Sequence, residues 1–360
     1  MTSHPATLHR EFSLTLMLTH ACNLRCTYCY MGEKRQQVMP RELGCAAIDR
    51  ALASMTDDGY LELGFFGGEP LLETRLIQTF MDYSLQAAAG KNIRVHFGIT
   101  TNGTHTQPAA WELMLRNDLD LSISCDGLPA THDRHRIRVD GSGSSDAVIA
   151  TIRRVVDAGK DLRIIMVVRP DSLADLPANV RFIRSLGVRH IEPSLDLWTT
   201  WSIQDEQQLQ PIVAQLADIW RDGLPGNSIG WFDEKAAHLA KLAFPPATRC
   251  GFGNGAVAVA PTGNLYPCER LIGEDSPQSP IRLQGNAADG GCDFLHLHNT
   301  SQRDHISCNS CAMDSMCNTF CRCGNYTRTG DPRRPDRLLC SWNQACLSET
   351  ARILRELQPR

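Results

Sequence analysis

Six short apolar segments alternate with amphipathic stretches over the first half of this 360-residue chain. The candidate strands are 12–19, 61–66, 93–100, 119–124, 162–168 and 188–195. The hydrophobic periodicity between them predicts helices near 41–56, 74–89, 108–117, 146–158 and 174–186. Strands that alternate with helices across short connections form a parallel sheet. Six such units predict an α/β fold, an open, partial (β/α)6 barrel with its chemistry at the carboxyl ends of the strands.

The alternation stops near residue 200. Helical stretches at 203–222 and 233–243 lead into a region dense in glycine, proline and cysteine, and the segment ETARILREL then closes the chain as a helix. A region so poor in core-forming residues needs cross-links such as bound metal. The sequence therefore predicts a barrel over 1–200, a helical bridge over 201–249 and a cysteine-rich domain over 250–360.

Charge and hydropathy exclude several classes of protein. The formal net charge is -4 and the pI is about 6.3, so no basic field attracts nucleic acid. No run of 18 apolar residues is present, so no membrane span is expected. The N-terminal segment combines a short apolar run with charged residues and is interpreted as a first strand, not a signal peptide. The expectation is a cytoplasmic protein without nucleic-acid or membrane partners.

The 15 cysteines are the anomaly in the composition, and in a cytoplasmic protein they indicate metal or redox chemistry. Cys22, Cys26 and Cys29 lie within eight residues. A structural zinc site takes four ligands, so three thiolates leave one position open. A 4Fe–4S cluster held by three cysteines would leave one iron free for another molecule, and soft thiolates suit iron–sulfur chemistry. A partial zinc site and chance clustering are the alternatives.

The segment CNLRCTYC, from Cys22 to Cys29, resembles the signature of the radical S-adenosylmethionine (SAM) superfamily, and Tyr28 also fits that pattern. The resemblance implies that Cys22, Cys26 and Cys29 hold a 4Fe–4S cluster whose free iron chelates the amino and carboxylate groups of SAM. An electron from the cluster then cleaves SAM, and the resulting 5′-deoxyadenosyl radical abstracts a hydrogen atom from the substrate.

Three further segments resemble strand-end motifs of the same superfamily: FFGGEP at 65–70, ITTNG at 99–103 and SISCDG at 122–127. Glycine permits close backbone approach, Glu69 is expected to hold the SAM ammonium, and Ser124 and Asp126 are candidates for polar contacts to SAM or substrate. Cys125 is interpreted as a small buried hydrophobe.

The segment HDRHRIRVDGSGS at 132–144 resembles a loop of the peptide-modifying branch of this superfamily. There Arg136 would pair with the SAM carboxylate through two parallel bonds, with a solvated loop as the alternative. The resemblance thus assigns to cofactor binding the residues Gly67, Gly68, Glu69, Thr101, Asn102, Ser124, Asp126 and Arg136.

The C-terminal cysteines follow a second pattern. Cys250 and Cys268 flank a glycine turn, and a C-x2-C-x5-C-x3-C run precedes one more cysteine. This order resembles the SPASM extension of radical SAM enzymes, which implies two auxiliary 4Fe–4S clusters and three clusters in total. The first would be held by Cys250, Cys268 and Cys321, and the second by Cys308, Cys311, Cys317 and Cys340. A zinc ribbon is the alternative for the C-x2-C-x5-C-x3-C run.

This chain departs from the sulfatase-maturating relatives, which place another cysteine between the equivalents of Cys250 and Cys268. The first auxiliary cluster therefore has either an open iron that binds substrate or a fourth ligand from elsewhere. The sequence leaves Cys292, Cys323 and Cys346 as candidates for that ligand. Cys45 lies in an expected helix and is interpreted as a packing residue.

SPASM enzymes mostly modify peptides, so the resemblance implies oxidative modification of a peptide or protein side chain, with a crosslink or thioether as product. Glu269, directly after Cys268, is the candidate general base, and an exposed salt-bridging glutamate is the alternative. Formylglycine formation on a sulfatase is a second enzymatic hypothesis. An iron–sulfur electron carrier or scaffold without SAM chemistry is the alternative of another class.

The resemblance also implies partners. A flavodoxin- or ferredoxin-type protein would donate electrons. About eleven residues precede the first strand, so we expect no leader-binding module, and a separate protein is a candidate for presenting a leader peptide. Trp198, Trp201 and Trp231 are either the lining of a peptide cleft or ordinary core packing.

Overall fold

The computed structural model describes residues 7–240, 251–297, 308, 311, 317 and 321–357. These residues contain a single nine-stranded sheet of order β7-β6-β5-β4-β3-β2-β1-β8-β9, in which every neighbouring pair is parallel except β8 and β9. The strands are β1 His9–Thr19, β2 Met55–Gly67, β3 Arg94–Thr101, β4 Leu119–Ser124, β5 Arg163–Val168, β6 His190–Leu195, β7 Ser228–Ile229, β8 Ala256–Val259 and β9 Leu265–Tyr266.

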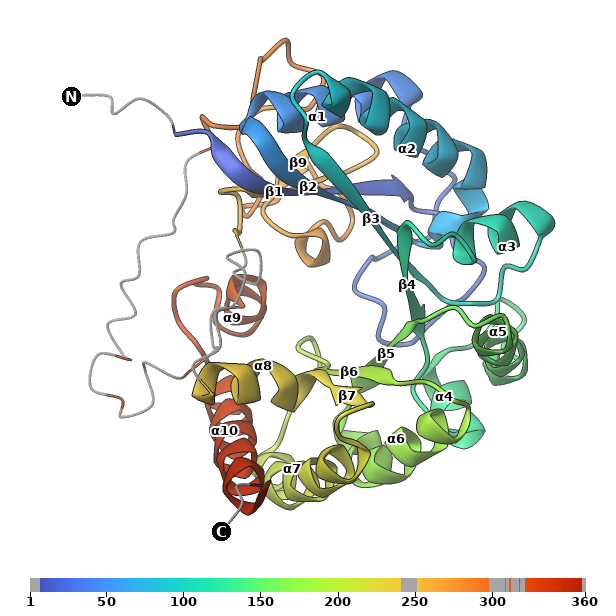
Figure 1. Cartoon of the computed structure of the whole chain (residues 1–360), viewed down its shortest axis with the longest axis vertical. Helices are drawn as coiled ribbons and strands as arrows, with labels where there is room; N and C mark the ends of the chain where they lie inside the picture. Colours follow the sequence, from blue (N-terminus) through green and yellow to red (C-terminus); the bar gives the residue numbers. More distant parts are fainter. Residues whose placement is uncertain are drawn as a thin grey trace.

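The sheet is curved and most helices lie along its outer side (Figure 1). They are α1 Arg41–Ala53, α2 Thr74–Ala89, α3 Pro108–Met114, α4 Pro129–His135, α5 Ser145–Asp157, α6 Leu176–Ser185, α7 Ile203–Gly223, α8 Gly230–Leu239, α9 Arg322–Thr329 and α10 Arg337–Leu357. Short 3-10 turns are η1 Pro70–Glu73, η2 Pro170–Asp175 and η4 Glu269–Leu271. Helix α9 lies on the open side of the arc, and α10 packs against α7 and α8.

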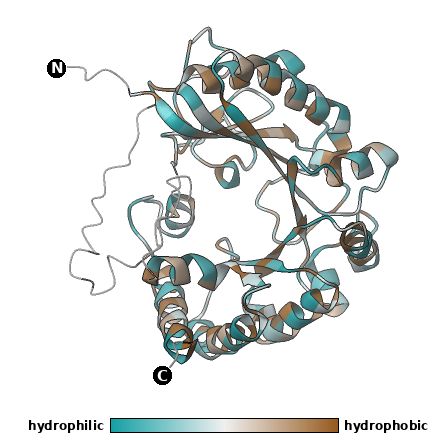
Figure 2. Ribbon diagram, viewed as in Figure 1, coloured by the Kyte–Doolittle hydropathy of each residue, from teal (hydrophilic) through white to brown (hydrophobic). Residues whose placement is uncertain are grey.

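The predicted open α/β barrel is confirmed, because all six expected strands and the five helices between them are present within a few residues of their expected bounds. Hydrophobic residues follow the strands and alternate with hydrophilic ones along the outer helices (Figure 2). Leu14 and Leu16 of β1 are fully buried, as are Leu61 and Leu63 of the neighbouring β2. In this part of the chain the hydrophobic periodicity alone determined the elements.

Two helices differ from expectation. The C-terminal helix α10 begins at Arg337, well before the ETARILREL segment, and it includes Cys340 and Cys346. Leu338, Leu339, Cys346 and Leu347 share one buried face of this helix. Residues 132–144 were expected to form a loop, but their first four residues end helix α4.

Strand β1 lies inside the sheet because the hairpin β8–β9 from the cysteine-rich region extends it. Ser13 pairs with Ala256 and Leu16 pairs with Val259 in parallel register. The turn of the hairpin contains Gly263 at φ +86°, a left-handed conformation that favours glycine. The short strand β7 of the expected bridge also joins this sheet, so strands from all three predicted parts share one layer. The predicted domain division itself stays a prediction.

Several smaller predictions have clear outcomes. Cys125 is fully buried in the main hydrophobic core, and Cys45 packs against that core from α1. Trp201 and Trp231 are buried core residues, whereas Trp198 is 43% exposed. Within the described ranges, no helix is long and apolar enough to cross a membrane.

Candidate functional site

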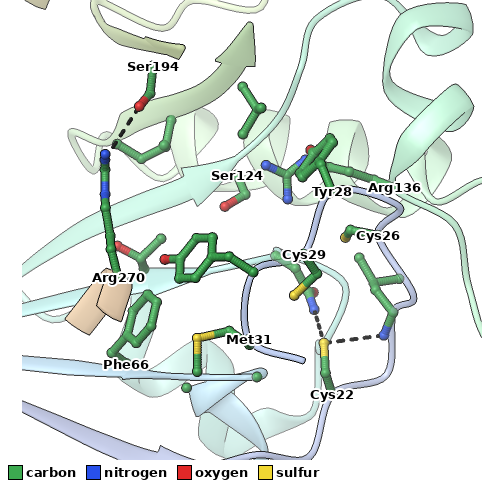
Figure 3. Close-up of a pocket in the computed structure, with 18 of the residues that line it drawn as sticks. Cys22, Cys26, Tyr28, Cys29, Met31, Phe66, Ser124, Arg136, Ser194 and Arg270 are labelled. Carbon is green, nitrogen blue, oxygen red and sulfur yellow. Dashed lines mark hydrogen bonds between the residues drawn. The ribbon is translucent and has the colours of Figure 1, made fainter. Parts of the chain in front are cut away.

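A cavity lies at the carboxyl ends of the strands, where the sequence motifs were expected to meet (Figure 3). Parallel strands present their carboxyl ends at one edge, so residues that follow different strands converge there. The figure shows the three cysteines of the first motif on one side of the cavity and Arg270 beside Ser194 on the other. Of the predicted site residues, those that line the cavity are Cys22, Cys26, Cys29, Gly67, Gly68, Thr101, Asn102, Ser124 and Arg136.

The loop after β1 carries Cys22, Cys26 and Cys29, and another segment of the chain holds its backbone. Two backbone hydrogen bonds tie it to the segment after α4, because Arg25 N donates to Ile137 O at 2.7 Å and Thr27 N donates to His135 O at 2.9 Å. The part of segment 132–144 around His135 and Ile137 therefore holds the cysteine loop, whereas residues 139–142 are exposed.

A polar residue at the end of β3 holds the start of the same loop. Asn102 Nδ2 donates to Asn23 Oδ1 at 2.9 Å and lies 3.8 Å from Cys22 Sγ. The Cys22 sulfur also accepts from Leu24 N at 3.4 Å. Asn102 was predicted to bind cofactor, and in this structure it contacts the loop that carries the first cysteine.

The three cysteines form a donor set suited to iron–sulfur ligation. Lys34 Nζ donates to Cys29 Sγ at 2.9 Å, which places a cation beside the third cysteine. Burial raises the pKa of Cys22 to about 11. Across the described residues, no group of three or more His, Cys, Asp or Glu side chains could hold a metal ion. A 4Fe–4S cluster binds each thiolate through a different iron, so three cysteines would leave its fourth iron open.

The end of β2 approaches the cysteine loop closely. Gly68 N donates to Thr19 O at 2.8 Å and Glu69 N donates to Ala21 O at 2.9 Å. A Cβ atom on Gly68 would lie 2.2 Å from Ala21 O, which is a backbone atom. Glycine is required here because the two backbones touch.

We therefore expect Gly68→Ala to displace the cysteine loop, because neither backbone can yield without moving it. The iron content of the reconstituted protein should fall, and SAM-cleaving activity should fall with it. Gly90→Ala at the end of α2 is the matched control, since nothing lies within 4 Å of its Cβ. Equal iron content in the two variants would show that the contact between the backbones does not hold the loop.

Glu69 lies beneath the cavity and does not line it. Its carboxylate accepts from Leu71 N at 3.0 Å, Thr101 Oγ1 at 2.7 Å and Asn102 N at 2.7 Å. It is fully buried, and burial raises its pKa to about 6. In this structure Glu69 thus joins the ends of β2 and β3, and its predicted contact with the SAM ammonium stays a prediction.

Asp126 and Arg136 form a buried ion pair beside the cysteine loop. Arg136 Nε donates to Asp126 Oδ2 at 3.2 Å, and both side chains are less than a tenth exposed. The Tyr28 hydroxyl donates to the same oxygen, and Val167 N donates to Asp126 Oδ1 at 2.9 Å. Arg136 lines the cavity whereas Asp126 does not. The aspartate therefore orients the arginine, and its predicted contact with SAM or substrate stays a prediction.

A second cavity adjoins the first on the side of the cysteine-rich region, and Tyr30, Trp198 and Arg270 line both. The rings of Tyr30 and Trp198 stack at 4.5 Å. Arg270 Nη2 donates to Ser194 Oγ at 3.4 Å. Glu269, the predicted base, lines neither cavity, and its carboxylate lies 3.5 Å from Cys268 Sγ.

Sequence reasoning did not select Lys34, Tyr30 or Arg270. Their positions in the sequence could have indicated them, because each residue lies within five residues of a predicted cysteine ligand. A cation so close to a thiolate motif has an electrostatic role to fill.

The C-terminal cysteines form two groups. Burial raises the pKa of Cys340 most, and the charges of Cys317, Cys308 and Cys311 also raise this pKa, to about 11 in all, so these three side chains lie near Cys340. Asn343 Nδ2 also donates to Cys317 Sγ at 2.7 Å. Cys340 thus lies near the cysteines of the C-x2-C-x5-C run, and their predicted ligation of one cluster stays a prediction.

The other group contains Cys268, Cys321 and Cys323. The Cys321 and Cys323 sulfurs are 3.3 Å apart, and the Cys323 thiol is hydrogen-bonded to Cys268. Cys250, the remaining predicted member, lies outside the described residues.

Comparison with known proteins also indicates a radical SAM enzyme. The family model described as "Radical SAM superfamily" matches residues 16–183. A cysteine-type anaerobic sulfatase-maturating enzyme from Clostridium novyi is 24% identical over 91% of this chain and 92% of its own length. The mycofactocin maturase MftC of Mycolicibacterium smegmatis is 29% identical over 88% of this chain and 78% of its own.

A solved structure shares the fold along nearly the whole chain. Native anSMEcpe with bound AdoMet and Cp18Cys peptide superimposes with a TM-score of 0.78 at 20% identity, over 96% of this chain and 98% of that one. The predicted partial barrel followed by a cysteine-rich C-terminal region is thus an architecture that a solved protein also adopts. With the CxxxCxxC loop at the mouth of the barrel and these similarities over most of its length, the chain belongs to the radical SAM superfamily of enzymes, which use a 4Fe–4S cluster and SAM.

Proposed function

We propose that this enzyme oxidatively modifies a side chain of a peptide or protein, with a crosslink or thioether as the product. The observation that carries the proposal is the pair of adjoining cavities. The inner one contains the three cysteines and the outer one opens beyond Tyr30, Trp198 and Arg270. A peptide lying in the outer cavity could send one side chain past these residues toward the cysteines. Both relatives described above carry maturase names, in agreement with a macromolecular substrate.

The chain's own residues have distinct roles in this proposal. Cys22, Cys26 and Cys29 hold the cluster, and Arg136, fixed by Asp126, takes the SAM carboxylate through a charge-assisted bond. When bound, the cluster and SAM together supply the 5′-deoxyadenosyl radical that abstracts hydrogen. The apolar part of the cavity wall, including Leu24, excludes water from the radical.

The cysteine-rich region holds two auxiliary 4Fe–4S clusters in this proposal. Cys250, Cys268 and Cys321 belong to the first, and Cys308, Cys311, Cys317 and Cys340 belong to the second. The grouping of Cys340 with the C-x2-C-x5-C cysteines supports the second set. Electrons arrive from a flavodoxin- or ferredoxin-type donor, and a separate protein presents the substrate if it has a leader.

Glu269 remains the proposed general base, because it follows Cys268 and its neighbour Arg270 lines both cavities. Glu269→Gln should reduce product formation at least about 100-fold, since positioned bases contribute at least that much. Formation of 5′-deoxyadenosine should continue, because SAM cleavage precedes proton loss. Glu274→Gln in the same segment is the matched control, with a side chain 56% exposed. Equal product yields from the two variants would assign the proton to another group.

A second candidate is formylglycine formation on a sulfatase. The similarity to the Clostridium novyi enzyme over nearly the full length favours it. Incubation with a peptide containing Cys-x-Pro-x-Arg or Ser-x-Pro-x-Arg separates the two candidates. A formylglycine product, detected by mass spectrometry, would favour this reaction over crosslink formation.

The experiment that tests the proposal begins with anaerobic reconstitution. About twelve irons per chain are expected for three clusters. Addition of SAM and dithionite should release 5′-deoxyadenosine, and deuterium should move into that product from a labelled peptide substrate. Iron without SAM cleavage would instead indicate an electron carrier or scaffold, and bound zinc would indicate structural metal sites.

A further inference from the structure

The fourth ligand of the first auxiliary cluster was left open by the sequence, and the structure separates its three candidates. We propose that Cys323 is this ligand, so that the first auxiliary cluster has four cysteines and no iron open to substrate. The inference rests on the proposed presence of auxiliary clusters. It concerns one residue that departs from the sulfatase-maturating pattern, in which the extra cysteine lies between the equivalents of Cys250 and Cys268.

Three thiols meet at one point from two distant segments. Cys268 follows β9 and is the residue before η4, whereas Cys321 is the residue before α9 and Cys323 is the second residue of that helix. The sulfurs of Cys321 and Cys323 lie 3.3 Å apart, and Cys323 is also hydrogen-bonded to Cys268. Cys323 is only 3% exposed, and its thiol lies between the other two. Ligation would replace these thiol contacts with bonds to separate irons.

The other two candidates lie in different surroundings. Cys346 is fully buried in the hydrophobic core, and the charged groups that act on it are Lys235 and Glu349. Cys292 is exposed, and its charge acts on Arg50 of α1. Arg50 in turn donates to the carbonyl oxygen of Asp293, which places Cys292 beside α1.

A cation and a helix N-terminus lie beside the three thiols. Arg270 lies close enough that the charges of Cys323, Cys321 and Cys268 all act on its guanidinium. Gly324 N donates to Cys321, as expected for an anion at a helix N-terminus. These groups would offset the cost of burying the thiolates that a cluster requires. Cys323 thus has the position of a ligand beside Cys321.

A closed cluster changes how substrate is held. No thiolate or amide of the substrate could bind to an iron of this cluster without displacing a cysteine. The substrate would instead be held by the walls of the two cavities, with Arg270 between the cluster and the shared opening. The substrate would then lie near the auxiliary cluster with no coordinate bond to any of its irons.

The test uses iron chemistry and not turnover. The background is the full chain with Cys22, Cys26 and Cys29 changed to alanine, because the open cluster of the first motif would otherwise obscure the result. This protein should bind about eight irons after reconstitution. Mild oxidation removes iron from a three-cysteine cluster and gives a 3Fe–4S signal in electron paramagnetic resonance. We expect no such signal in this background and a signal near one spin per chain after Cys323→Ser. Cys346→Ser and Cys292→Ser, as matched controls, should behave like the background.

A second measurement needs no variant at position 323. In the reconstituted full chain, iodoacetamide should leave Cys323 unmodified, and removal of the clusters by chelation under denaturing conditions should expose it. Cys292 should react in both states. Mass spectrometry of the digested chain reads both outcomes.

The outcomes separate this inference from the proposed function. A 3Fe–4S signal in the unmodified background, or one produced by Cys346→Ser or Cys292→Ser, would overturn the assignment of Cys323 while leaving the auxiliary clusters in place. Ready alkylation of Cys323 in the iron-loaded chain would overturn it as well. A background protein that binds no iron would overturn the auxiliary clusters, and this inference with them.

Discussion

Replacement of Cys26 by alanine should abolish the cleavage of SAM to 5′-deoxyadenosine while leaving about eight irons bound. The middle cysteine of the loop lines the cavity, and a cluster with two remaining ligands is not retained at that site. The C-terminal cysteines lie in separate groups and do not depend on this loop for ligands. The measurement is anaerobic iron counting together with chromatography of the nucleoside products.

Cys45→Ala is the matched control for that experiment. Cys45 is also a partly buried cysteine near the N-terminus, but it packs against the core from α1 and does not line the cavity. It should retain about twelve irons and full SAM cleavage. SAM cleavage by Cys26→Ala at the rate of this control would contradict the assignment of the loop to the radical SAM cluster.

Replacement of Asp126 by asparagine should lower the free energy of unfolding by about 3–5 kcal/mol, because it leaves the Arg136 guanidinium buried without a counter-ion. Asparagine has the same shape and keeps an oxygen for Val167 N, so the change removes charge and little else. Urea unfolding followed by circular dichroism measures the loss. Affinity for SAM should fall as well, since Arg136 loses the group that orients it.

The neighbouring strand residue Asp120 provides the control for this prediction. Its side chain is 69% exposed and pairs with His96 on the surface, so Asp120→Asn should change the free energy of unfolding by no more than about 0.5 kcal/mol. Similar losses for the two variants would mean that the buried ion pair contributes no more than a surface pair does.

The barrel could be predicted from sequence because burial alternates along its strands, whereas its helices bury one face. The spacing of apolar residues therefore predicted the strands and helices, and Leu14 and Leu61 are buried as that spacing predicts. Most of the C-terminal region lacks such a pattern. A cysteine there can be a packing residue or a metal ligand, and the sequence alone does not separate the two. Cys346 lies on the buried face of α10, yet without neighbours it could equally have been a ligand.

The candidate site was predicted in its components but not in its contacts. Motifs at strand ends located Gly67, Thr101 and Ser124 correctly, since topology alone brings strand ends together. The partners of Glu69 and Asp126 could not be predicted, because each carboxylate accepts hydrogen bonds from segments far away in the sequence. Long-range hydrogen bonds leave no periodic trace in a single chain.

The pairing of β1 with β8 has a consequence for how the chain folds. The strand that ends in the first cysteine motif obtains one of its two neighbours only after some 240 further residues have been made. Contacts of such long sequence separation slow folding, and until they form one edge of β1 is exposed to other chains. A chain cut after the sixth barrel strand should therefore aggregate during refolding, and adding residues 251–297 to that fragment should suppress the aggregation.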